Sequence, residues 1–132
     1  MEKKIAFSPS VYEHAASLIG MTPWDVSHDV ELLWFAHRTA YEMYHHSPII
    51  VGIDIYNLEA EAYGCTVEHP GGNGIPAVTR GIFDSIAETR SLKPFDPKSD
   101  GRIGMIIEAG KRLSAEFPEA DVRIPVSGPF SI

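Results

Sequence analysis

Acidic side chains gather at the end of the most apolar segment of the chain. Residues 49–55 read Ile-Ile-Val-Gly-Ile-Asp-Ile, so Asp54 lies in the last third of this run, and Glu59 and Glu61 follow shortly after it. The β-branched residues favour a strand buried on both faces. Carboxylates at the carboxyl end of a buried parallel strand are where α/β sheets and barrels place their chemistry. Asp54 is therefore the candidate catalytic residue.

Asp54 is either a functional carboxylate or a paired carboxylate of the core. Both interpretations are open, because a carboxylate in an apolar strand is costly to bury unless it is paired or functional. Glu59 and Glu61 lie two positions apart on a predicted short helix, so only one of them is expected to face inward and the other to be in solvent. The candidate substrate-binding residues are those that follow the two core-like strands, although turn chemistry also explains some of them: Tyr56, Asn57, Glu59 and Ser127. Asn57 and Ser127 are expected to share a concave site with Asp54.

Other residues with chemical potential have simpler explanations. His45 and His46 are adjacent and cannot face one metal site from a helix. Gly71, Gly72 and Gly74 lack the lysine of a phosphate-binding loop, so a turn is predicted. The single cysteine, Cys65, is predicted to be a packed residue and encodes neither a disulfide nor a zinc site. Arg102 is expected to pair with Asp96 or Asp100. No metal site is predicted within the chain.

Composition excludes several classes of partner. The 132 residues include 18 acidic and 11 basic side chains, a net charge of −7 that disfavours nucleic acid and anionic membranes. No run approaches the roughly 20 apolar residues of a membrane span, and none resembles a signal peptide. With one cysteine, the chain fits a reducing compartment. We therefore expect a cytoplasmic protein.

The order of predicted elements places the two apolar strands side by side. Helices are expected from Ser8 to Gly20, for one turn after Thr22-Pro23, and from Ser27 or Asp29 to Tyr44. Strands are expected at 49–55, 65–68 and 122–126, with an extended segment at 77–82 and a weak helix at 83–92. A helix capped by Asp100 and ended by Pro118 separates the last two strands. This order predicts a β-α-β crossover with parallel strands 49–55 and 122–126.

The core packing of the long helix is also predicted. Its apolar and aromatic residues recur at three- and four-residue steps and form one stripe, which indicates a buried face rather than a cofactor pocket: Val30, Leu33, Trp34, His37, Tyr41 and Tyr44.

Several motifs together resemble the uroporphyrinogen decarboxylase superfamily, which holds tetrapyrrole decarboxylases and corrinoid-dependent methyltransferases. Their order and spacing match along most of residues 10–132: Val51-Gly-Ile-Asp-Ile, Glu59-Ala-Glu-Ala-Tyr-Gly-Cys65, Pro76, Phe95-Asp-Pro, Asp100-Gly-Arg102 and Pro125-Val-Ser-Gly-Pro-Phe-Ser-Ile132. The resemblance implies an α/β fold, the N-terminal portion of a (β/α)8 TIM barrel with a helical N-terminal extension. It implies an extension at 1–48 and the first β/α units at 49–132. Since such a barrel needs roughly 250 residues, we expect a truncated barrel.

The resemblance leaves three functions open. The first is a uroporphyrinogen decarboxylase-like fragment that acts on a tetrapyrrole or corrinoid-linked substrate and is inactive alone, with Asp54 stabilising a protonated pyrrole and no cofactor. The second is a corrinoid methyltransferase, for which zinc is implied only in a full-length homologue. The third is a non-catalytic, self-associating binding module. A homo-oligomer is expected in each case, because strands 49–55 and 122–126 of a truncated barrel would expose apolar faces and unpaired edges. A small-molecule tetrapyrrole or a corrinoid protein is the expected partner.

Two departures from the family pattern bear on that choice. The decarboxylase branch carries an Arg-Gln-Ala-Gly-Arg motif that holds substrate carboxylates, and no stretch of this sequence matches it. Asp54 also lies one residue further from Gly64 than the decarboxylase pattern expects. The Glu-Ala-Glu-Ala-x-Gly form resembles the methyltransferase-like branch.

Overall fold

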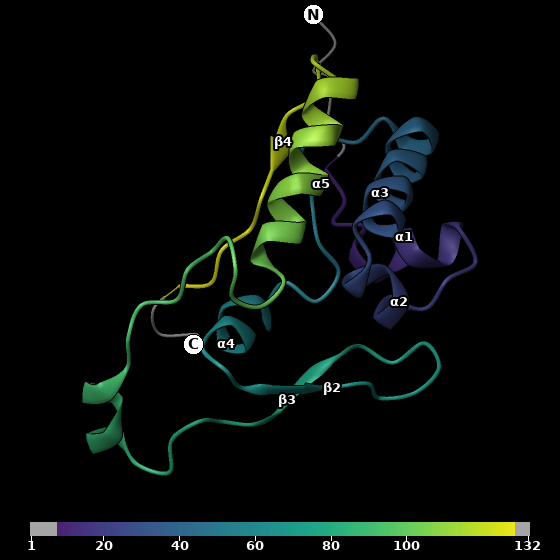
Figure 1. Ribbon diagram of the computed structural model, residues 1–132. Coiled ribbons are helices and arrows are strands. Elements are labelled where there is room, and N and C mark those ends of the chain that lie inside the picture. Colours follow the sequence, from purple (N-terminus) through teal and green to yellow (C-terminus); the bar gives the residue numbers. More distant parts are fainter. Residues whose placement is uncertain (1–7, 129–132) are drawn as a thin grey trace, which may run out of the picture.

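The fold is a mixed α/β arrangement in which helices pack on a small parallel sheet (Figure 1). A computed structural model describes residues 8–128. Within that range the elements follow one another in this order: α1 (Tyr12–Leu18), α2 (Pro23–His28), α3 (Val30–Tyr44), β1 (Ile49–Ile50), α4 (Leu58–Ala62), β2 (Thr66–Glu68), β3 (Ala77–Arg80), the 3-10 helix η1 (Ile86–Ser91), α5 (Ile103–Glu116) and β4 (Val122–Arg123).

The starts of α2 and α3 follow the predicted capping signals. The Thr22 hydroxyl accepts the Asp25 N–H while the Asp25 carboxylate accepts the Thr22 N–H, a reciprocal capping box with Pro23 in the first turn. The Asp29 carboxylate caps α3 by accepting two backbone N–H groups. The predicted start of the first helix at Ser8 is wrong. Helix α1 begins at Tyr12, and its N-cap residue, Val11, has no side chain able to accept a hydrogen bond.

The aromatic stripe of α3 packs in the core as predicted. Leu33 and His37 are fully buried, and the other stripe residues pack partly buried against the core cluster. Figure 1 shows α3 beside α5, with α1 and α2 on its other side. Because α1, α2 and α5 all pack against α3, its apolar face includes bulky residues along its whole length.

Strands β1 and β4 pair in parallel, as predicted, with Ile49 opposite Val122 and Ile50 opposite Arg123. Both strands are shorter than predicted. The reason in β1 is Gly52, whose φ of +137° lies in a region that favours glycine and turns the chain out of the ladder. An added Cβ there would lie 2.7 Å from the Ile55 side chain. Burial continues through residue 54 even though the ladder has ended.

Between α4 and α5 the chain forms the antiparallel hairpin β2–β3 and then η1. In Figure 1 the hairpin lies below α2, whereas η1 lies far from the three N-terminal helices. The predicted strand at 65–68 and the extended segment at 77–82 are confirmed as β2 and β3. The weak helix predicted at 83–92 is a 3-10 helix, and it buries no residue.

The predicted cap of α5 is wrong. Arg102 occupies the N-cap position of α5 and makes no capping hydrogen bond through its side chain. The Asp100 carboxylate instead accepts the N–H of Asp96 at 2.8 Å. Gly101, with φ +58°, brings this turn against α4, where an added Cβ would lie 3.0 Å from the Ala62 nitrogen. This close approach directs the Arg102 side chain toward α4 rather than back along its own turn. No helix in residues 8–128 has the length and hydropathy needed to cross a membrane.

Candidate functional site

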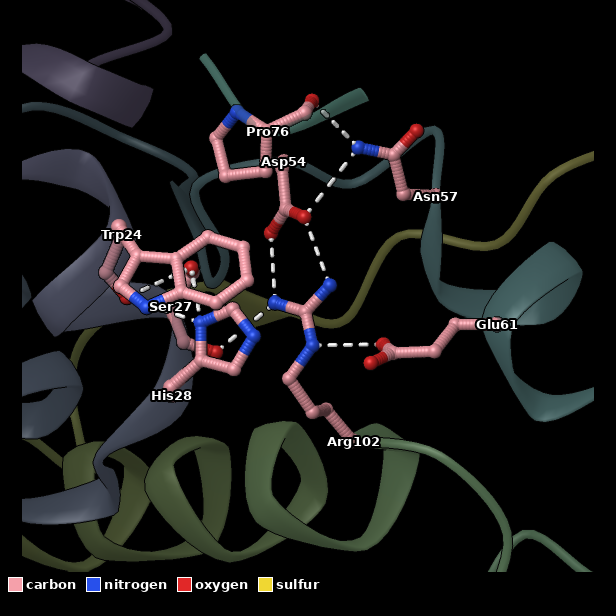
Figure 2. Close-up of polar contacts among 8 residues, drawn as sticks. All are labelled: Trp24, Ser27, His28, Asp54, Asn57, Glu61, Pro76 and Arg102. Atoms are coloured by element: carbon pink, nitrogen blue, oxygen red, sulfur yellow. Dashed lines mark hydrogen bonds and ion pairs between the residues drawn. The ribbon is translucent and has the colours of Figure 1, made fainter. Parts of the chain in front are cut away.

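Asp54 and Arg102 form a two-pronged buried ion pair at the carboxyl end of β1 (Figure 2). The Arg102 Nη1 donates to Asp54 Oδ1 at 2.9 Å and Nη2 donates to Oδ2 at 2.7 Å. Asp54 is 3% exposed and Arg102 is 8% exposed. Such parallel hydrogen bonds between guanidinium and carboxylate are the geometry that arginine provides and lysine does not.

Arg102 is also bonded to two other elements. Its Nε donates to Glu61 Oε2 at 2.6 Å, and its Nη1 donates to the Ser27 carbonyl oxygen of α2 at 2.8 Å. The predicted pairing of Arg102 with Asp96 or Asp100 is therefore wrong. Burial alone would lower the pKa of Arg102, but the hydrogen bonds and charges of Asp54 and Glu61 outweigh it and raise that pKa. The guanidinium stays charged and holds three segments together.

Asn57 connects Asp54 to the hairpin. The Asn57 Nδ2 donates to Asp54 Oδ2 at 3.2 Å and to the Pro76 carbonyl oxygen at 2.7 Å. Pro76 directly precedes β3, so this side-chain amide ties the base of the hairpin to the end of β1 (Figure 2). The predicted proximity of Asn57 to Asp54 is confirmed.

Glu59 and Ser127 lie together but apart from the Asp54 pair. The Ser127 backbone N–H donates to Glu59 Oε1 at 2.7 Å, a bond that joins α4 to the chain after β4. Ser127 bonds Glu59 and has no hydrogen bond to Asp54. The structure therefore does not bring Ser127 together with Asp54 as predicted. The expectation that Glu59 or Glu61 is in solvent is also wrong. Glu59 is buried, and Glu61 is partly buried and paired with Arg102.

Tyr56 lies on the surface next to this network. Its side chain is 76% exposed, although it is one residue from Asn57 and two from Asp54. A nearby aromatic cluster was not predicted: Trp24 stacks on His28 with ring centroids 3.9 Å apart and on His69 at 4.9 Å. These rings come from α2 and from the hairpin loop. No spacing in the sequence brings the two segments together, so only tertiary structure reveals the cluster.

The arrangement limits what Asp54 can do chemically. Both of its oxygens accept hydrogen bonds, two from Arg102 and one from Asn57. These bonds hold the carboxylate in one orientation, and Arg102 must move before both oxygens can contact a substrate. The cluster of Asp54, Glu61 and Arg102 combines two carboxyl groups with one guanidinium. The site therefore suits a ligand that brings no negative charge of its own.

Comparison with known proteins matches the chain to a family. Residues 8–132 match the family described as uroporphyrinogen decarboxylase (URO-D). The chain belongs to the URO-D family. This confirms the superfamily that the motifs predict.

A solved structure of a methyltransferase from Methanosarcina mazei has a similar fold, with a TM-score of 0.74 and 20% sequence identity. The similarity covers 94% of this URO-D chain and 36% of the methyltransferase chain, so the chain spans little more than a third of that protein's length. A search of curated proteins gave no match.

The fit of a metal to this URO-D chain can be tested on its side chains. Residues 8–128 contain no group of three or more His, Cys, Asp or Glu side chains placed to hold a metal ion. Cys65 is a free, partly buried thiol that lines a cavity with Tyr63 and Phe83, which are not zinc ligands. The described residues therefore do not fit the zinc that the resemblance implies for a full-length methyltransferase, and no chemical step is assigned to zinc here.

Proposed function

We propose that the chain is the N-terminal portion of a (β/α)8 barrel and forms one wall of a site for a corrinoid-linked methyl group. In this proposal the reaction class is methyl transfer rather than decarboxylation of a tetrapyrrole. Tyr56 contacts the substrate, while Asp54 and Asn57 fix the end of β1 beneath it.

The observation that carries the proposal is that Arg102 already makes four hydrogen bonds within the protein, out of the five that its N–H groups can donate. A tetrapyrrole decarboxylase must bind substrate carboxylates, and cations are the groups that do so. Within the cluster around Asp54, Arg102 is the one cation, and its bonds already go to Asp54, Glu61 and Ser27. The remaining charge of the cluster is negative and would repel a polycarboxylate. Asp54, in turn, is neutralised by Arg102 and gives little stabilisation to a protonated pyrrole.

Two further facts support methyl transfer. The exposed ring of Tyr56 offers a flat, uncharged surface on which a corrinoid could pack. The similar solved structure is described as a methyltransferase, which favours the same reaction class for this chain. The decarboxylase that acts on a tetrapyrrole is the alternative within the family.

Binding of methylcobalamin and of uroporphyrin, a polycarboxylate, tests the proposal. Equilibrium dialysis of the 132-residue chain is expected to show binding of methylcobalamin and none of uroporphyrin. Tyr56→Ala should weaken methylcobalamin binding by about 0.5–1.5 kcal/mol, roughly twofold to tenfold in Kd, because aromatic packing contributes on that scale. Little turnover is expected, since a barrel site is assembled from the ends of several strands.

The matched control is Phe35→Ala, which removes another exposed aromatic side chain, on α3 and outside the site. It should leave methylcobalamin binding unchanged. Uroporphyrin binding tighter than methylcobalamin binding would overturn the assignment and favour the decarboxylase.

A self-associating binding module is the second candidate, and exposed apolar residues at the end of β4 favour it. Ile124 and Val126 are 40% and 82% exposed, and β1 and β4 form a sheet of only two strands in the described residues. The β1 residues Ile49, Val51 and Ile53 are buried, contrary to the expectation that this strand exposes an apolar face. We propose that a second copy of the chain covers the Ile124–Val126 segment.

Sedimentation velocity over a micromolar concentration series is expected to show a dimer or a larger assembly. Val126→Asp should shift it toward monomer, because a charge would then be buried at the interface. Ile86→Asp, at an apolar residue of η1 that is 90% exposed, is the control and should leave the assembly unchanged. A folded wild-type monomer throughout the series would refute self-association.

A further inference from the structure

A cavity of about 260 Å3 lies between α4, α5 and the chain that follows β4. Its lining residues come from these segments, and Figure 1 shows α4 and the chain after β4 close to the first turns of α5. At about 30 Å3 for each water-sized group, the cavity has room for roughly nine such groups. Its walls are almost entirely apolar, and these residues provide most of them: Leu58, Phe95, Ile103, Ile106, Ile124 and Val126.

Glu59 is the one charged residue that lines this cavity. Its side chain belongs to a residue that is 8% exposed, and its Oε1 is occupied by the Ser127 N–H. Its Oε2 is buried and has no hydrogen-bond partner among residues 8–128. No lysine, arginine or histidine in that range forms an ion pair with Glu59.

An unpaired buried carboxylate oxygen is costly in either protonation state. The ionised form lacks a cation, and the protonated form would need an acceptor for its O–H. Protein atoms cover Oε2, so in this conformation it contacts neither bulk water nor the interior of the cavity. The adjoining cavity is the space from which a donor can arrive.

We propose that this cavity binds a small organic cation, a primary alkylammonium whose N–H groups donate to Glu59 and whose hydrocarbon part packs on the isoleucines. The charge of Glu59 selects the ammonium, and the apolar walls select an alkyl body over a hydrated inorganic ion. Binding draws the Glu59 carboxylate to the surface of the cavity while Oε1 keeps the Ser127 bond.

This site is separate from the one proposed for the methyl group. Glu59 and Glu61 lie two residues apart on α4, and Glu61 faces Arg102 while Glu59 faces the cavity. Neither Asp54, Tyr56 nor Asn57 lines the cavity. Failure of alkylammonium binding would therefore leave the methylcobalamin experiment unaffected, and the reverse also holds.

Titration of the full chain with n-butylammonium, followed by NMR of isoleucine methyl groups, tests the inference. Shifts are expected at Ile103, Ile106 and Ile124, and none at Ile86 on η1, which lies outside the cavity. The neutral analogue n-butanol should bind roughly tenfold to hundredfold more weakly, because hydrogen bonds to a charged group are worth that much in affinity.

Glu59→Gln keeps an acceptor for the Ser127 N–H but removes the charge, so n-butylammonium should then bind no better than n-butanol. The matched control Glu108→Gln, at an exposed glutamate of α5, should bind as the wild type does. Equal binding of n-butylammonium and n-butanol to the wild type would overturn the inference, whatever the stability of the variants. So would an absence of shifts with both.

Discussion

Replacing Arg102 with methionine is expected to lower the free energy of unfolding by about 3–5 kcal/mol. The substitution keeps much of the side-chain volume but leaves the buried Asp54 carboxylate without its guanidinium, and it also removes the bonds to Glu61 and Ser27. Breaking a buried pair costs more than the pair itself contributes, because one charge remains uncompensated. Urea unfolding followed by circular dichroism measures this change.

Arg123→Met is the matched control for this experiment. Arg123 pairs with Asp121 on the surface, where solvent screens the interaction, and its loss should change stability little. The double variant Asp54→Asn/Arg102→Met should lose much less than the sum of the two single variants, since the second substitution removes the charge that the first one exposed. Additive losses would show that Asp54 and Arg102 do not interact as described.

Acidification from pH 6.5 to pH 4 is expected to destabilise the protein through His37. This histidine is fully buried on α3, its Nε2 accepts the Gly52 N–H at 3.0 Å, and its Nδ1 has no partner in the described chain. Burial lowers the pKa of His37 from 6.5 to about 4, against a raising effect of the Gly52 backbone, and nearby His46 lowers it further. Burial also lowers the pKa of His46.

The sign of the effect follows from the depressed pKa in the folded state. Above pH 6.5 the histidine is neutral in both the folded and the unfolded state and does not change the free energy of unfolding. Below pH 6.5 the unfolded chain binds a proton at this histidine and the folded chain does not, so the free energy of unfolding falls. The loss from His37 alone reaches about 3 kcal/mol by pH 4. The difference between the stability–pH curves of wild type and His37→Gln isolates this contribution. An NMR titration of His37 giving a pKa near 6.5 in the folded protein would contradict the prediction without relying on the variant.

Local signals in the sequence predicted the starts of α2 and α3 but not those of α1 and α5. The caps at Thr22 and Asp29 were readable because the hydrogen bonds they make close within three residues. The lengths of the core strands could not be predicted from the sequence. The run from Ile49 to Ile55 is as apolar as a full strand, yet Gly52 turns its backbone toward His37, fifteen positions earlier in the sequence, and ends the ladder.

Around the candidate site, short-range neighbours were predicted from the sequence but long-range partners were not. The proximity of Asp54 and Asn57 could be predicted, because Asp54 lies near the end of the apolar run and Asn57 follows three residues later. The partners of Arg102 could not be predicted, since Asp96 and Asp100 are close in sequence while Asp54 and Glu61 are 48 and 41 residues away. The same limit applies to the Trp24 and His69 stack and to the Ser127 bond of Glu59, which depend on how separate elements pack.

The bond between Arg102 and the Ser27 carbonyl has a consequence for how the chain folds during synthesis. It closes a separation of 75 residues, so α2 lacks this partner until residue 102 has left the ribosome. Contacts of such long range slow folding, because the entropy of closing the intervening loop is lost before the contact forms. The N-terminal helices can form early, but their attachment to the end of β1 waits for residue 102.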